Sequence, residues 1–112
     1  MLVMLASCSS KEIKTPDWLQ GVWVQESGYE EINVTADNIQ ISTFGQTSVD
    51  LKELMTTYEN ASLDQKTKGE TYNVTVINKD TGMGISFGFS LDGDNIKVTV
   101  GGQTYTYVKD NG

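Results

Sequence analysis

The second half of the chain alternates between apolar and polar residues with a period of two, and this pattern constrains the fold more than any other feature. From residue 70 onward, four runs of residues alternate in this way. Successive side chains of a β-strand point to opposite faces, so each run predicts a strand with one apolar face. Turn signals separate the runs, at residues 79–82, at Asp92-Gly93 and at Gly101-Gly102. Together they predict a four-stranded antiparallel meander.

The turns also predict which residues lie opposite each other. Two-residue loops at Asp92-Gly93 and Gly101-Gly102, with an even-length loop around residues 80–81, put the large apolar residues on one face. The expected partners are Phe89 with Ile96, Phe87 with Val98 and Ile85 with Val100; Val98 with Tyr105 and Ile96 with Tyr107; and Val76 with Ile85, Val74 with Phe87 and Tyr72 with Phe89. A slip of one residue in any strand would turn its apolar set to the other face.

The first half of the chain predicts three more strands and one helix. The strands are expected over residues 20–26, 31–35 and 38–43, the helix over 48–59, and a polar loop over 60–69. The helix has its apolar residues at positions i, i+3, i+4 and i+7, and either Thr47 or Ser48 suits its N-cap. Seven strands with one apolar face each must curl or stack to bury that face. We therefore expect an all-β, mainly antiparallel fold over residues 17–110, an up-and-down meander curled into a small barrel, with a two-sheet sandwich as the alternative.

Composition excludes several classes of function. The chain has 8 basic residues, all Lys, against 15 acidic ones, so its net charge of −7 argues against binding nucleic acid. It has no His and no Arg, and its single Cys cannot form an intrachain disulfide or a cysteine-based zinc site. No motif places an activating base beside a nucleophile. We expect no enzymatic activity, no catalytic residues, no metal and no cofactor.

The amino-terminal residues Leu5-Ala6-Ser7-Cys8 follow a short apolar run and precede a polar stretch. This arrangement resembles the lipobox of bacterial lipoproteins, in which the cysteine is lipidated after cleavage. The resemblance implies that residues 1–7 are part of a signal peptide, that Cys8 carries the lipid, and that residues 8–16 form a flexible tether. It also implies attachment to a bacterial outer membrane, on its periplasmic or its surface-exposed face.

A second resemblance begins at Trp18, which Gly21 and Trp23 follow at a spacing of Trp-x-x-Gly-x-Trp. An opening strand of this kind soon after a lipobox is similar to the small lipocalin-like lipoproteins common in Bacteroidetes. In that family the second Trp packs across the barrel floor and Gly relieves crowding beside it. An Arg of the last strand usually stacks on this Trp; because this chain has no Arg, Lys109 is expected to substitute through a cation–π contact.

The predicted meander brings several aromatic residues onto one face. They could line a cavity for a small apolar or amphiphilic ligand, and the residues concerned are Trp23, Tyr72, Phe87, Phe89, Tyr105 and Tyr107. The same residues could instead fill the core. The alternative function is then a non-enzymatic protein-interaction module, such as a protease inhibitor or a component of a surface complex. On the reverse face of one strand the residues are small (Gly84, Ser86, Gly88, Ser90), which indicates either barrel curvature or a shallow groove.

Overall fold

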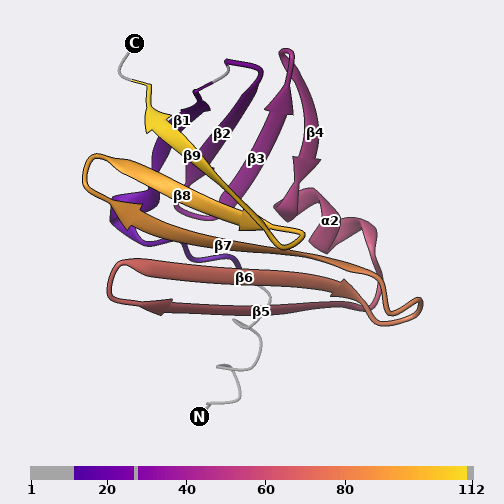
Figure 1. Ribbon diagram of the computed structural model, residues 1–112. Helices are drawn as coiled ribbons and strands as arrows, with labels where there is room; N and C mark the ends of the chain where they lie inside the picture. The colour runs from indigo at the N-terminus through magenta and orange to yellow at the C-terminus, as the bar shows by residue number, and fades with distance from the viewer. Residues whose placement is uncertain (1–11, 27, 111–112) are drawn as a thin grey trace.

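The structure is a computed structural model that describes residues 12–26 and 28–110 (Figure 1). Its described strands form one antiparallel sheet in the order β4-β3-β2-β1-β9-β8-β7-β6-β5. The strands are β1 (Gly21–Gln25), β2 (Glu30–Thr35), β3 (Asn38–Thr43), β4 (Gln46–Asp50), β5 (Ala61–Lys68), β6 (Thr71–Asn78), β7 (Gly84–Asp92), β8 (Asn95–Val100) and β9 (Gln103–Lys109). A short 3-10 helix, η2 (Asp17–Leu19), precedes β1, and helix α2 (Leu51–Thr57) follows β4. The predicted all-β class is confirmed.

The sheet curls into a half-barrel. Strands β1–β4 fold over β5–β7, and β8 and β9 cross between the two groups (Figure 1). The first and last strands pair directly, so the sheet is continuous there, whereas β4 and β5 are its two edges. Helix α2 connects these edges and lies at the seam between them (Figure 1). The core fills the inside of the curl with inward-facing residues of the strands, among them Trp23, Ile32, Ile39, Tyr72, Phe89, Ile96 and Tyr107.

Two strands, β4 and β5, are not predicted from the sequence, because neither has a strong apolar face. Strand β4 is exposed over its first three residues, and β5 is mostly polar. The structure therefore corrects two expectations: residues 48–50 belong to a strand and not to the helix, and most of residues 60–69 form a strand and not a loop. The helix is shorter than predicted, and its N-cap is Asp50 rather than Thr47 or Ser48. The Asp50 carboxylate accepts a hydrogen bond from the Glu53 backbone N–H at 3.0 Å.

Most of the predicted register is confirmed. Strands β6 and β7 pair Tyr72 with Phe89, and β8 and β9 pair Val98 with Tyr105, both as expected. The predicted β7–β8 register is wrong by two residues, because Phe89 lies opposite Val98 rather than Ile96. The turn is centred on Gly93-Asp94, one position after the predicted Asp-Gly pair. Such a shift changes each partner by two residues and preserves the face, so apolar alternation cannot detect it.

The segment before η2 is packed against the barrel. Ile13 is buried, and the Thr15 hydroxyl donates a hydrogen bond to the Thr35 carbonyl at 2.6 Å. The Lys14 backbone N–H donates to the Gln65 side chain of β5 at 2.9 Å. Residues 12–16 therefore do not form the flexible tether expected for this stretch, because Ile13 has apolar surface to bury. Cys8 and residues 1–7 lie outside the described residues.

Candidate binding surfaces

Trp23 and Lys109 form a contact at the end of the barrel where β1 begins. The Trp23 ring is buried, and its indole N–H donates a hydrogen bond to the Leu19 carbonyl of η2 at 2.7 Å. The Lys109 ammonium lies 4.5 Å from the centre of this ring and donates to the Gln20 carbonyl at 2.8 Å. The expected cation–π contact is confirmed, and it joins the first strand to the last.

Gly21 makes room for this contact. Its φ of +131° is a conformation that L-residues rarely adopt, and a Cβ built on it would lie 2.4 Å from the Lys109 ammonium nitrogen. Any side chain here would have to displace the lysine or distort the backbone. The crowding that Gly21 relieves is with Lys109, whereas the expectation placed it beside Trp23.

The predicted aromatic face is brought together inside the barrel, with one exception. Trp23, Tyr72, Phe89 and Tyr107 each expose 3% of their surface or less, and Phe87 exposes 4%. The Phe89 ring centre lies 6.1 Å from the ring centres of both Tyr72 and Phe87. Tyr105 is the exception: it is 36% exposed, and its hydroxyl bonds to the neighbouring Gln103 side chain at 2.5 Å.

The hydroxyl groups of the two buried tyrosines are satisfied by polar partners. The Tyr72 hydroxyl donates to Gln65 Oε1 at 2.8 Å, and the Tyr107 hydroxyl donates to Glu30 Oε1. Burial raises the pKa of Tyr72 to about 12. Burial, and then the hydrogen bond to Glu30, raises the pKa of Tyr107 as well. Both groups therefore serve as neutral donors that hold polar side chains in place.

The outer face of β6, β7 and β8 has a shallow polar depression with a volume of about 530 Å³. Its lining includes small residues of the predicted reverse face, Ser86, Gly88 and Ser90. A Cβ on Gly88 would lie 2.9 Å from the side-chain oxygen of Asn73 on the next strand. The close approach of the Asn73 side chain therefore favours glycine at position 88. The floor of the depression consists largely of hydroxyl and amide groups.

A different surface, absent from the sequence-based predictions, presents aromatic side chains to solvent. Tyr29 is 59% exposed and Phe44 is 74% exposed, and their ring centres lie 5.1 Å apart. Tyr29 lies in the β1–β2 connection and Phe44 in the β3–β4 turn, where its backbone N–H donates to the Tyr29 carbonyl at 2.9 Å. We call these two rings the aromatic pair. A signal is present in the sequence: Phe44 occupies a turn position next to Gly45, where a large apolar residue is unusual.

The backbone at Phe44 strengthens this observation. Phe44 and Gly45 are the two central residues of the turn, with φ values of +53° and +80°. Positive φ at both positions suits Asn and Gly and disfavours a bulky side chain. Phe44 is therefore held in an unfavourable conformation that keeps its ring at the tip of the turn.

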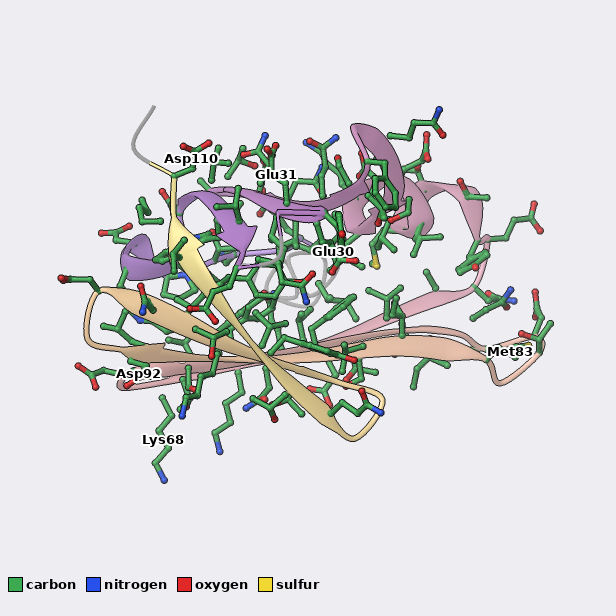
Figure 2. All side chains as sticks on the ribbon, turned by 45° about the horizontal axis from the view of Figure 1, so that its top comes forward. Glu30, Glu31, Lys68, Met83, Asp92 and Asp110 are labelled. Carbon is green, nitrogen blue, oxygen red and sulfur yellow. The ribbon has the colours of Figure 1, made fainter. Side chains whose placement is uncertain are left out.

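The aromatic pair stands beside Glu31 on the outer face of the sheet. Val24, Glu31 and Ser42 are direct cross-strand neighbours on β1, β2 and β3. They line a pocket of about 340 Å³ together with the aromatic pair and adjoining residues. Glu30 and Glu31 lie on opposite faces of β2 (Figure 2). The Glu30 carboxylate faces the barrel interior, where it accepts a hydrogen bond from Tyr107, and the Glu31 carboxylate faces the outer surface.

The fold and these surfaces define a small curled β half-barrel with a filled core. No protein-family model, curated protein or solved structure matches this chain. Among residues 12–26 and 28–110, no group of three or more acidic, His or Cys side chains is placed to hold a metal ion. Within the same residues, no helix is long and apolar enough to span a membrane.

Proposed function

We propose that the protein is a non-enzymatic binding module of a bacterial envelope that recognises another protein through its outer surface. The observation that carries this proposal is the aromatic pair, Tyr29 and Phe44, which is exposed on the outside of a barrel whose interior aromatic residues are buried. Exposed aromatic side chains at loop tips are typical anchors of protein interfaces.

The interior supports this proposal over the binding of a small apolar ligand. Ligand pockets in proteins have volumes of about 300–1,000 Å³, and their lining residues expose surface to the cavity. Tyr72 and Ile96 expose 0% of their surface, and Trp23 exposes 3%. A ligand could enter among these side chains only if the barrel opened and separated them, with loss of the apolar contacts in the core.

The envelope location rests on the lipobox-like residues Leu5-Ala6-Ser7-Cys8. We propose that a lipid on Cys8 anchors the chain to the outer membrane, with the folded domain beginning a few residues later. Metabolic labelling with an alkyne-tagged fatty acid tests the anchor. Label is expected on the wild type and absent from Cys8→Ala; label that persists in Cys8→Ala would contradict it.

Two measurements test the proposed function. First, NMR titration of the full chain with palmitate, haem and cholesterol hemisuccinate should leave the methyl and ring signals of the core unchanged. Saturable shifts at Trp23 and Phe89 would favour the ligand-binding alternative. Second, affinity capture from envelope extracts should recover a stoichiometric protein with the wild type and lose it with Tyr29→Ser and Phe44→Asn. Equal recovery with both variants would overturn the proposal.

A further inference from the structure

The geometry points to an arginine side chain of the partner protein as the group that this surface recognises. We infer that its guanidinium group inserts between the aromatic pair and the carboxylate of Glu31. This inference rests on the proposed function, because it names the chemistry of the partner at the same surface. The inference rests on the shape of the pocket, on the unengaged carboxylate of Glu31 among the described residues, and on the distribution of charge.

The pocket combines an aromatic wall with a carboxylate floor. The Tyr29 and Phe44 rings, 5.1 Å apart, form the wall, and Glu31 lies in the floor between Val24 and Ser42. A guanidinium group is planar, stacks on aromatic faces and forms two parallel hydrogen bonds with a carboxylate. An aliphatic side chain would leave Glu31 desolvated without a partner, and an acidic one would be repelled. The pocket therefore favours a cation with a flat, multi-donor head.

Glu31 is available for this role, whereas its neighbour is not. Glu30 accepts hydrogen bonds from the Tyr107 hydroxyl and from the Thr43 hydroxyl, the latter at 3.4 Å. Within residues 12–26 and 28–110, no hydrogen bond or salt bridge engages the side chain of Glu31, which is exposed. The sheet thus fixes the position of Glu31 through its backbone pairing and leaves its carboxylate for a partner.

An apolar patch extends the same surface, so the contact is not limited to one side chain. Val24 pairs with Val108 of β9, and Val22 lies two residues before Val24 on the same outer face. All three valines are partly buried by their neighbours. An apolar centre with a charged group beside it is the arrangement expected of a protein interface.

The charge distribution favours a basic partner on this side. Glu31 and Asp110 lie on one side of the molecule and Lys68 on the opposite side (Figure 2). Lys66 and Lys68 belong to β5 and Lys97 to β8. Neither strand pairs with β1, β2 or β3, which carry Val24, Glu31 and Ser42 of the pocket. Lys109 of β9 is engaged by Trp23 and the Gln20 carbonyl. Because the chain has no Arg, a second copy cannot supply the guanidinium group. The occupant is therefore a different protein that presents an arginine.

NMR titration of the full chain with N-acetyl-arginine amide tests the inference even before the partner is identified. N-acetyl-citrulline amide, which has the same shape without the charge, and N-acetyl-lysine amide are the comparison probes. The arginine probe should give saturable shifts of the Tyr29 and Phe44 ring signals. The citrulline probe should give none, and the lysine probe should bind at least about tenfold more weakly.

Two variants distinguish specific binding of the arginine probe at Glu31 from nonspecific electrostatic attraction to an acidic protein. Glu31→Gln should weaken the arginine probe at least about tenfold, since it removes a charge-assisted pair. Glu70→Gln, in the β5–β6 turn, changes the net charge equally and should leave binding unchanged. Equal effects of the two variants, equal affinity of the lysine and arginine probes, or absence of saturation would each overturn the inference.

Capture of the natural partner separates failure of this inference from failure of the proposed function. If Phe44→Asn abolishes capture and Glu31→Gln does not, the surface is an interface but the arginine is refuted. If neither variant alters capture, the proposed function fails as well. Concentration-dependent shifts of the Tyr29 and Phe44 rings without any probe would show self-association through this face, and this result would overturn the inference.

Discussion

The Lys109 ammonium group lies 4.5 Å above the Trp23 ring and, through its hydrogen bond to the Gln20 carbonyl, ties the last strand of the half-barrel to the residue before the first. This contact closes the side of the sheet where the first and last strands meet. It lies apart from the aromatic pair, so we expect it to govern stability and not recognition.

Substitution of Lys109 by Met tests that role. Lys109→Met keeps a long apolar stem but loses the cation–π contact and the charged donor to Gln20, each contributing about 1–2 kcal/mol in a partly buried setting. We expect the free energy of unfolding to fall by about 2–4 kcal/mol, measured by urea unfolding followed by Trp fluorescence. Lys97→Met, which removes an exposed pair 3.9 Å from Asp92, is the control and should cost less than about 0.5 kcal/mol.

Gly21→Ala should destabilise the protein by two separable effects. The new Cβ would meet the Lys109 ammonium nitrogen, and the residue would still have to adopt a φ of +131°. We expect a loss of about 2–4 kcal/mol, measured by urea unfolding, from strain and steric overlap together. In a Lys109→Ala background the overlap disappears and only the backbone strain remains. The two changes should therefore be non-additive, and strictly additive losses would show that Lys109 does not crowd Gly21.

Two substitutions of Phe44 should have different effects on stability. Phe44→Ala loses the contact with Tyr29, and alanine, like phenylalanine, disfavours the φ of +53° at this position. The Ala variant should therefore be less stable than the wild type. Phe44→Asn loses the same contact but suits the positive φ of this turn. We expect the Asn variant to be more stable than the Ala variant by about 1 kcal/mol, by thermal unfolding at matched pH. Equal stabilities would mean that the backbone at Phe44 is not strained.

The buried hydroxyl of Tyr72 should make the protein lose stability in alkali. The unfolded chain releases this proton near pH 10, whereas the folded protein retains it up to about pH 12. Between these values the unfolded state binds fewer protons, so the free energy of unfolding falls as pH rises, with a slope of up to about 1.4 kcal/mol per pH unit from this group. Tyr72→Phe should show a shallower decline between about pH 10 and 12. The two proteins would have parallel profiles if Tyr72 titrated normally when folded.

Asp50 should hold helix α2 against the edge of the sheet. Burial opposes ionisation of this carboxyl, but hydrogen bonds from Gln40, the Glu53 backbone and Asn38 together lower its pKa. Asp50→Ala should cost about 1–2 kcal/mol through loss of the N-cap and of the bonds to Asn38 and Gln40. Because the folded pKa is lowered, this stabilisation is present above the ordinary value of 3.8 and is lost as pH falls. Hydrogen exchange at the amides of residues 51–57 is the direct measurement, with Glu59→Ala as the control.

The fold can be predicted from the sequence best where strands have strong apolar faces. In β6 and β7 the alternation of Tyr72 and Val74 against Phe87 and Phe89 predicts the buried face, and the length of the connecting loop then selects the register. Strand β5 escapes prediction because it is an edge strand: Gln65, which packs against Tyr72, contributes a hydrogen bond where alternation would require an apolar residue. Polar residues of this kind look like loop residues until the partner strand is known.

The candidate site depends on information that is not local in the sequence. Tyr29 and Phe44 lie in different turns and meet only because β2 and β3 pair from Glu30 with Thr43. The contact of Lys109 with Trp23 could be predicted because a resemblance to a known family suggests it. The turn position of Phe44 next to Gly45 is the one local signal, and it does not indicate that Tyr29 is the partner of Phe44.

The seam between β4 and β5 has a consequence for how this architecture can change over time. These two strands do not pair, and they are connected by the seven-residue helix α2, which follows β4 directly, and by residues 58–60. Residues can be added or removed between α2 and β5 without breaking any pair of strands. A lineage that starts from this barrel can therefore change the length of this one connection while the paired strands and the aromatic surface are retained.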